Sequence, residues 1–182
     1  FGAIADGAIE LVTRRFLTDG IPDQFTLGMT YASPTSVYCP NPFEFHSSLV
    51  NRLNSGSLFW IYIGHGHIGT LDQFQIGDKS LDILNTRLLE KVAVNHGPPI
   101  AVFLACYTGA FDAPQDCLAE RMTMLPNGPI AALAGTRMTM PYGMSALGAE
   151  LLDSCFIEQS ATLGELVLAA KQRAVHFGFE KE

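Results

Sequence analysis

The chain has 182 residues, of which 48% are hydrophobic and only 16% are charged, a composition typical of a folded globular domain and unlike that of a disordered segment. Its eleven lysines and arginines are scattered, and the formal net charge of −7 argues against a nucleic-acid partner. No apolar run reaches the roughly 20 residues that a membrane-spanning helix needs, so no membrane segment is expected.

Apolar residues recurring at helical spacing predict helices, and short continuous apolar runs predict buried strands. Glycines and prolines separate these segments. The patterns first predict a helix over residues 3–17, a short strand over 25–31, a proline-rich loop over 33–42 and a helix over 43–53. A strand then runs from residue 57 to the Gly-His-Gly at 64–66, followed by an irregular stretch to residue 79, a helix over 81–94, a strand over 100–106 and a loop over 107–115. The rest of the chain is predicted to form a helix over 116–125 with Asp116 as its N-cap, a strand over 129–135, a loop over 137–143, and two helices over 144–157 and 162–175.

This alternation of helices and strands predicts an α/β fold with parallel strands and with helices on both faces of the sheet. No internal repeat or second core is recognisable, so residues 1–182 are expected to form a single domain. Because Phe1 is not an initiator methionine and the end at Glu182 resembles a cut, we expect this domain to belong to a longer chain truncated at both ends.

Two of the expected strands end in residues that carry chemistry. One ends at His65, between two glycines, and the other ends at Cys106. Parallel strands bring their carboxyl ends to one edge of the sheet, where open α/β folds keep their sites. A thiol attacks as its thiolate, which a nearby histidine favours, and a histidine can also protonate a leaving amine. The pattern therefore predicts a cysteine hydrolase, most simply a peptidase.

A tetrahedral intermediate also needs amide donors aimed at its oxyanion. Gly66 follows the candidate base, carries no Cβ that would crowd a substrate carbonyl, and can offer its N–H group. The N–H group of Cys106 is the natural second donor, and the small Ala105 keeps the turn before it open. Taken alone, Cys106 could equally be an inert core thiol and His65 a loop-tip residue.

The same histidines, glycines and cysteines also permit other kinds of site, each of which the sequence disfavours. His65 and His67 could begin a metal site, but no third ligand with suitable spacing accompanies them, so no metal and no cofactor is expected. His67 is also the rival candidate for the base. Residues 64–69 match the glycine pattern of a dinucleotide site, but no helix is predicted to open on the third glycine. The four cysteines form no C-x-x-C pair, which argues against structural zinc, and a disulfide framework is not expected in so large a domain.

Three blocks of the sequence resemble the gingipain family of cysteine peptidases, which belongs to the caspase-like clan. They are Gly64-His65-Gly66, the run Ala-Cys-Tyr-Thr-Gly-Ala-Phe at 105–111, and Cys-Leu-Ala-Glu-Arg-Met at 117–122. The similarity continues through residues 130–136 and 162–166, and so covers nearly the whole chain. The Ala-Cys-x-Thr-Gly form at 105–109 also resembles the CHAT group of the same clan.

The resemblance implies a three-layer α/β/α sandwich with a mostly parallel, caspase-like sheet. It implies a catalytic dyad of His65 as general acid/base and Cys106 as nucleophile, with the Gly66 and Cys106 amides at the oxyanion and hydrolysis of peptide bonds through a thioester acyl-enzyme. Gingipains orient the histidine with an upstream acid, for which Asp6 or Glu10 is the candidate.

The expected substrate pocket departs from the family. The tryptophan that lines the gingipain S1 pocket is missing from the loop at 137–142, where Met140 or Tyr142 could replace it. Arg137 would suit an acidic P1 residue, although an ordinary surface charge is the simpler interpretation, and arginine specificity is not carried over. Cys117, within the predicted helix, is interpreted as a packing residue.

We therefore expect a thiol protease that acts on protein or peptide substrates, with no nucleic acid or membrane as partner and with other domains of a longer chain as further partners. The alternative is a catalytically silent caspase-like scaffold or sensor domain. An acyl- or peptidyl-transferase using the same dyad would differ only in what captures the acyl-enzyme. Gingipain relatives are typically secreted and CHAT relatives typically intracellular, so the compartment stays open between secreted and cytoplasmic.

Overall fold

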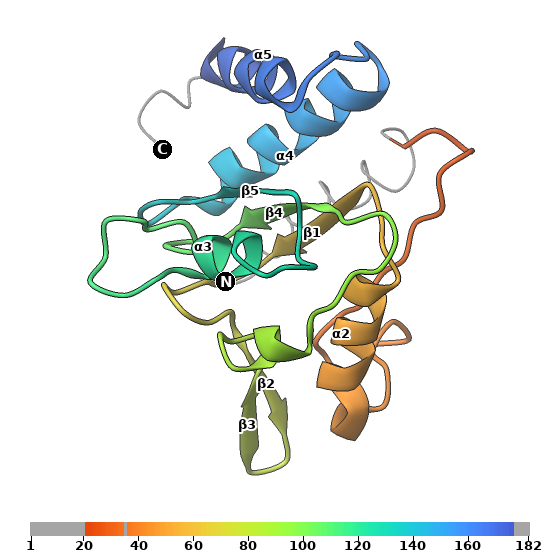
Figure 1. Ribbon diagram of the computed structural model, residues 1–182, viewed down its shortest axis with the longest axis vertical. Coiled ribbons are helices and arrows are strands. Elements are labelled where there is room, and N and C mark those ends of the chain that lie inside the picture. Colours follow the sequence, from red (N-terminus) through yellow and green to blue (C-terminus); the bar gives the residue numbers. More distant parts are fainter. Residues whose placement is uncertain (1–20, 35, 177–182) are drawn as a thin grey trace. The chain divides into compact units, whose positions relative to one another are not determined.

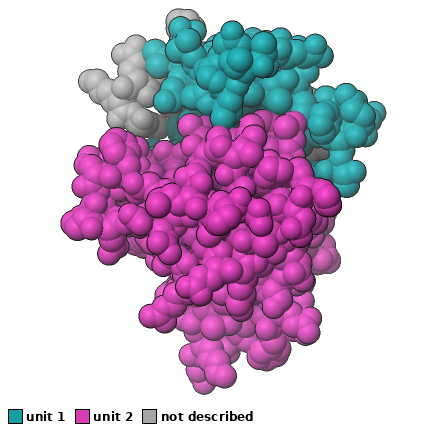
Figure 2. Space-filling view, viewed as in Figure 1, with its two compact units in different colours: residues 1–28, 139–182 teal, residues 29–138 magenta. Residues whose placement is uncertain are grey.

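The computed structural model describes residues 21–34 and 36–176 (Figure 1). Contacts divide the chain into two compact units: a terminal unit of residues 1–28 and 139–182, and a central unit of residues 29–138 (Figure 2). That residues 1–182 act as one domain stays a prediction.

The described elements are the 3₁₀ helix η1 (Pro42–Glu44), α2 (Phe45–Asn54), β1 (Phe59–Ile63), β2 (Gln73–Ile76), β3 (Lys79–Asp82), the 3₁₀ helix η2 (Leu88–Lys91), β4 (Ile100–Leu104), α3 (Leu118–Thr123), β5 (Ala131–Ala134), α4 (Pro141–Phe156) and α5 (Leu163–His176).

A three-stranded parallel sheet forms the middle of the central unit, with the strand order β1-β4-β5. All three strands are the apolar runs predicted from the sequence. The register pairs Phe59 with Ile100 and Ile63 with Leu104. β4 lies between two neighbours, and its residues Ala101 to Leu104 are buried, as its uninterrupted apolar run predicts.

One face of this sheet is covered by α2 and α3, because the buried side chains of both helices belong to the same hydrophobic cluster as those of β1 and β4. In α2, Phe45, Leu49 and Leu53 recur every four residues and form the buried stripe of an amphipathic helix. The ring of Phe45 stacks on Phe74 at 4.7 Å, which brings the segment after β1 into the same core.

The segment between β1 and β4 differs from the prediction. An antiparallel hairpin of β2 and β3 replaces the irregular stretch expected up to residue 79, and it extends away from the parallel sheet (Figure 1). Apolar and polar residues alternate along β2, and the two-residue turn Gly77-Asp78 suits a tight hairpin because Gly77 adopts a φ of +56°.

The helix expected over residues 81–94 is also wrong. The Asn85 side chain accepts the N–H groups of Arg87 and Leu88, a local bond that competes with a regular helix. Only the short η2 follows. Ile83, Leu84 and Val92, whose spacing favoured the apolar stripe of a helix, are nevertheless buried in the core.

Two further boundaries differ. Residues 25–31, expected to form a strand, belong to no strand in the structure. The cap of α3 is Cys117 and not Asp116, so Cys117 precedes the helix. The helix expected over residues 3–17 lies outside the described residues.

In the terminal unit, α4 and α5 correspond to the two helices predicted over 144–157 and 162–175, and they pack against each other. Arg173 of α5 bonds to the carboxylates of Glu150 and Glu158 and to the buried Ser154 hydroxyl. These contacts join the two helices through one guanidinium group. None of the helices within the described ranges is both long and apolar enough to cross a membrane.

Candidate active site

His65 and Cys106 follow neighbouring strands at the same distance. The pairing of β1 with β4 continues one residue beyond the strands, where the N–H of Gly64 donates to the carbonyl of Leu104 at 3.4 Å. The same register, extended, sets His65 opposite Cys106, since each lies two residues past its strand. Neighbouring strands run about 4.8 Å apart. His65 is exposed and Cys106 is half-buried, so both are accessible from solvent.

The histidine loop (residues 64–70) touches the cysteine loop (residues 105–115) at Gly66. A Cβ built on Gly66 would lie 2.7 Å from the carbonyl oxygen of Cys106 and 2.9 Å from the Cβ of Ala105. Both distances are far shorter than ordinary contacts, so only glycine fits here. The backbone of the candidate base is therefore packed directly on the backbone of the candidate nucleophile.

Helix α3 holds both loops through its first turn. The N–H of Leu118 donates to the carbonyl of Ile68 at 2.8 Å, and the N–H of Ala119 donates to the carbonyl of Thr108 at 3.0 Å. The first N–H groups of a helix have no partner within the helix, so they are available for such bonds. One helix start thus binds the histidine loop and the cysteine loop together.

A capping box fixes the start of α3. Glu120 accepts the N–H of Cys117 at 2.9 Å, and the Cys117 side chain accepts a bond from the third helical residue. This N–H bond holds the pKa of Glu120 below its ordinary value. Burial raises the pKa of the Cys117 and Cys155 thiols and so disfavours the thiolate at both positions. Cys117 is fully buried and packs, as expected.

The Tyr62 side chain forms hydrogen bonds with the backbone at the histidine loop and just after it. Its hydroxyl donates to the carbonyl of His65 at 2.9 Å and accepts the N–H of Asp72 at 3.3 Å. Burial raises the pKa of the Tyr62 phenol well above its usual range, so the hydroxyl keeps its proton and stays a donor. One hydroxyl group thus connects the carbonyl of the candidate base to the backbone of Asp72.

The cysteine loop is fixed on its other side by the chain that follows β5. The N–H groups of Tyr107 and Gly109 donate to the carbonyls of Arg137 and Gly135, at 3.1 and 2.9 Å. Tyr107 adopts a φ of +56°, a conformation unusual for a residue with a large side chain. Strain of this kind, one residue after a candidate nucleophile, is common at functional sites.

The other predicted residues are placed as follows. The Arg137 guanidinium binds Asp112 through two bonds of 3.0 and 2.7 Å, which lowers the pKa of Asp112. Met140 and Tyr142 are exposed at the start of α4, in the terminal unit. Asp6 and Glu10 lie outside the described residues. Within the ranges that the structure describes, no three histidine, cysteine or acidic residues meet as metal ligands.

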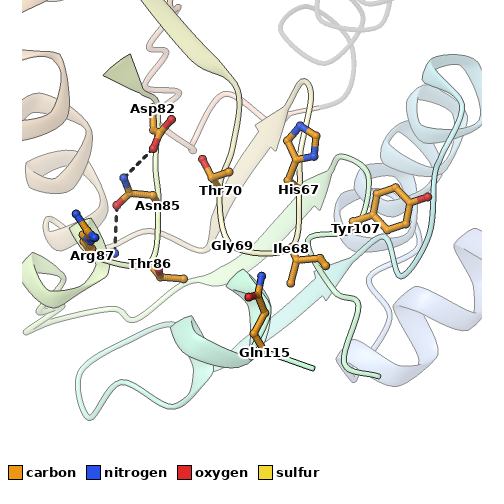
Figure 3. A pocket seen from close by; sticks show the side chains of 10 residues that line it. All are labelled: His67, Ile68, Gly69, Thr70, Asp82, Asn85, Thr86, Arg87, Tyr107 and Gln115. Carbon is orange, nitrogen blue, oxygen red and sulfur yellow. Dashed lines mark hydrogen bonds between the residues drawn. The ribbon is translucent and has the colours of Figure 1, made fainter. Parts of the chain in front are cut away.

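A pocket of about 650 Å³ opens beside the histidine loop (Figure 3). Its lining residues come from the histidine loop, the end of β3 with the segment after it, and the cysteine loop: His67, Ile68, Gly69, Thr70, Asp82, Asn85, Thr86, Arg87, Tyr107 and Gln115. This histidine-side pocket was not predicted from the sequence, because residues 81–94 were expected to form a helix. The Gly77-Asp78 turn, flanked by alternating residues, was the available signal.

A family model described as peptidase family C25 matches residues 2–181. The chain belongs to peptidase family C25. This confirms the resemblance to gingipains and, at the level of the family, the expected cysteine-type peptidase. No curated protein matches the chain significantly.

Solved structures share the fold of this C25 chain. The crystal structure of the Arg-specific cysteine proteinase gingipain R (RgpB) aligns with a TM-score of 0.66 and 16% identity, over 97% of this chain and 38% of that one. A complex of the pro- and mature domains of RgpB from Porphyromonas gingivalis aligns with a TM-score of 0.62 and 17% identity, over 93% of this chain and 37% of that one. A structure described only as a protease aligns with a TM-score of 0.61 and 19% identity, over 84% of this chain and 34% of that one.

These similarities confirm the expected caspase-like α/β fold with its mostly parallel sheet. They also show that the C25 chain spans little more than a third of the proteins it matches.

Proposed function

We propose that this C25 chain is a cysteine endopeptidase domain in which Cys106 is the nucleophile and His65 the general acid/base. The single observation that carries the proposal is the shared register of the two loops. His65 and Cys106 each lie two residues past paired strands, and Gly66 packs on the Cys106 backbone. The family match supports the same chemistry.

In the proposed reaction, the Cys106 thiolate attacks the scissile carbonyl carbon, and a C–S bond forms as the carbonyl π electrons move to oxygen. The Gly66 and Cys106 N–H groups donate to this oxyanion. The protonated His65 ring gives its proton to the amide nitrogen as the C–N bond breaks and the amine leaves. A thioester on Cys106 remains.

Water completes the cycle. His65 accepts a proton from a water molecule, whose oxygen attacks the thioester carbonyl. The C–S bond then breaks, the carboxylic acid leaves, and the thiolate and the protonated histidine are restored. No oxidant, reductant or metal enters this sequence of steps.

We also propose roles for the remaining expected residues. An acid from the segment at 3–17, either Asp6 or Glu10, orients His65. Met140 or Tyr142 takes the place of the tryptophan that lines the gingipain S1 pocket. Arg137 would suit an acidic P1 side chain, which would have to compete with Asp112 for its guanidinium. The substrate is a protein or peptide, and the rest of a longer chain supplies further domains.

The test is labelling of the intact protein by a peptide electrophile, with the modified residue found by mass spectrometry. We expect an adduct on Cys106 that is lost in His65→Ala and retained in His96→Ala, a change at an exposed histidine away from the site. Modification of Cys39 or Cys155 in place of Cys106 would overturn the assignment. No adduct on any cysteine would favour the silent scaffold. A peptide library varied at P1 then determines specificity.

A further inference from the structure

We propose that the histidine-side pocket binds the part of the substrate that follows the scissile bond, and that Arg87 selects an acidic side chain there. The inference rests on the proposed function, because it assigns a direction to a substrate cleaved by His65 and Cys106. It names a subsite on the leaving-group side, separate from the P1 pocket expected near Arg137.

The order of the loops along the sheet edge sets the direction of the substrate. The histidine loop follows β1, the cysteine loop follows β4, and Arg137 lies just beyond β5. The general acid must contact the leaving nitrogen, because it protonates that atom. The leaving group therefore lies on the β1 side of Cys106, and the P1 residue on the β5 side.

The pocket lies on the leaving-group side by this criterion. Four of its lining residues, His67 to Thr70, directly follow the candidate base and its neighbouring glycine, and Tyr107 directly follows the candidate nucleophile. None of its lining residues comes from β5 or from the segment that follows it. A peptide that leaves Cys106 past His65 would therefore run toward this pocket.

The size of the pocket suits a short stretch of peptide. A volume of about 650 Å³ corresponds to a width of roughly 9 Å, which an extended chain rising about 3.3 Å per residue crosses in about three residues. Figure 3 shows His67 and Tyr107 on one side of the pocket and Asp82, Asn85 and Arg87 on the other. The side chain that reaches Arg87 therefore belongs to the second or third residue after the scissile bond.

The polar lining determines the charge that the pocket accepts. Both carboxylate oxygens of Asp82 already accept bonds, from the side-chain amides of Gln73 at 3.3 Å and Asn85 at 2.9 Å. Arg87 differs, since its exposed guanidinium pairs with no carboxylate of the described residues. Arginine binds carboxylates through two parallel bonds. No cation of the described residues pairs with Asp82, but both of its oxygens already have donors, whereas the guanidinium of Arg87 has no carboxylate. The group in the pocket that is open to a new charged partner is thus Arg87, and that partner is aspartate or glutamate.

The pocket is also held in a defined shape. The N–H of Thr86 donates to the carbonyl of Gly69 at 3.1 Å, and Thr70 forms a bridge with Asn85. The N–H of Arg87 itself donates to the side chain of Asn85 at 3.1 Å, which fixes the backbone that carries the guanidinium. A fixed backbone lowers the entropy lost when the arginine binds a ligand.

The experiment is a digestion of a peptide library of known composition by the intact protein, with the new termini identified by mass spectrometry. In the wild type we expect aspartate and glutamate to be enriched at the second or third position after the cleaved bond. The enrichment should be on the order of fivefold, as for one accessible ion pair. Arg87→Gln should abolish the enrichment, and Arg87→Glu should replace it by enrichment of lysine and arginine. Arg52→Gln, on an exposed position of α2, is the matched control and should leave it unchanged.

Cleavage without acidic enrichment in the wild type, or enrichment that persists in Arg87→Gln, overturns this inference and leaves the proposed function intact. Absence of cleavage together with an unmodified Cys106 in the labelling experiment overturns the proposed function, and this inference with it. Acidic preference at the residue before the cleaved bond, in place of those after it, reverses the assigned direction and equally overturns the inference.

Discussion

Gly66 approaches Cys106 so closely that a methyl group on its α-carbon would come within 2.7 Å of the Cys106 carbonyl oxygen. The contact joins the two loops that carry the candidate base and nucleophile. It makes the separation of these loops depend on the absence of one side chain, so a single added carbon atom tests whether that separation matters.

Gly66→Ala should destabilise the protein by about 2 kcal/mol, because the new methyl group overlaps backbone atoms that cannot move independently. Labelling of Cys106 should slow by more than tenfold. Denaturant unfolding and the labelling rate measure the two effects. Gly164→Ala is the control, since its Cβ meets no atom closer than 3.9 Å. Unchanged labelling in Gly66→Ala would show that the spacing of the loops is not critical.

Glu120→Gln should lower both the melting temperature and the rate of Cys106 labelling, because the ionised Glu120 caps the helix that binds both loops. The pKa of Glu120 is depressed, so its contribution to stability is present above the ordinary glutamate pKa of about 4.3 and is lost as the pH falls below it. The difference from wild type should therefore disappear in acid. Melting curves from pH 3 to 7 test this.

The matched control is Glu165→Gln, because Glu165 accepts the N–H of Thr162 in a similar cap at the start of α5. This variant removes a capping carboxylate without touching either loop. We expect normal labelling of Cys106. Equal loss of labelling in both variants would mean that general destabilisation explains the effect, and not the loss of the hydrogen bonds from α3 to the two loops.

Tyr62→Phe should cost about 1 kcal/mol near neutral pH, because the carbonyl of His65 loses its donor. Burial raises the pKa of Tyr62, so the stability linked to its proton is full below the ordinary tyrosine pKa of about 10 and is lost as the pH rises above it. The wild type should therefore lose stability faster than Tyr62→Phe above pH 10. The free energy of unfolding is measured with denaturant at several pH values above 10. If it falls equally with pH in the two proteins, this prediction is contradicted.

Arg173→Met should destabilise the protein by about 2 kcal/mol, because it leaves Glu150, whose side chain is 13% exposed, without its cation. The buried Ser154 hydroxyl loses a partner as well. Lys171→Met removes the same charge from an exposed position of α5 and should have little effect. Denaturant unfolding of the two variants compares them directly, and similar losses would show that net charge, not the α4–α5 contact, is responsible.

The elements that carry the candidate site were predictable because their signals are local and strong. β1, β4 and β5 are uninterrupted apolar runs, and His65 and Cys106 each lie two residues past one of them. Parallel pairing then brings these residues to one edge, so both the sheet and the juxtaposition follow from topology alone.

The segment between the two strands could not be predicted in the same way. Apolar residues at helical spacing, such as Ile83, Leu84 and Val92, are buried there by tertiary packing. The Asn85 side chain accepts the N–H groups of the two residues that follow Thr86, in place of a regular helix. Periodicity does not distinguish a buried irregular segment from an amphipathic helix. The histidine-side pocket depends on this segment, and it was missed for that reason.

The start of α3 lies one residue later than predicted, because contacts outside the local residue pattern determine it. Asp116 is the residue type that a cap favours, yet Cys117 takes the position, helped by the Glu120 carboxylate and by complete burial of its side chain. The bonds from α3 to Ile68 and Thr108 involve backbone atoms only, which no residue pattern records.

Because one helix start binds both loops, the amide hydrogens of Leu118 and Ala119 are reporters of the two loops at once. A local opening that frees the histidine loop breaks the first bond, and one that frees the cysteine loop breaks the second, from adjacent residues of the same turn. Because Gly66 also packs on the Cys106 backbone, we expect the two loops to open together, so hydrogen exchange at these two positions should proceed with nearly equal protection, as in one cooperative unit. The candidate site then opens and closes as a whole, and a population with only half of it formed is not expected.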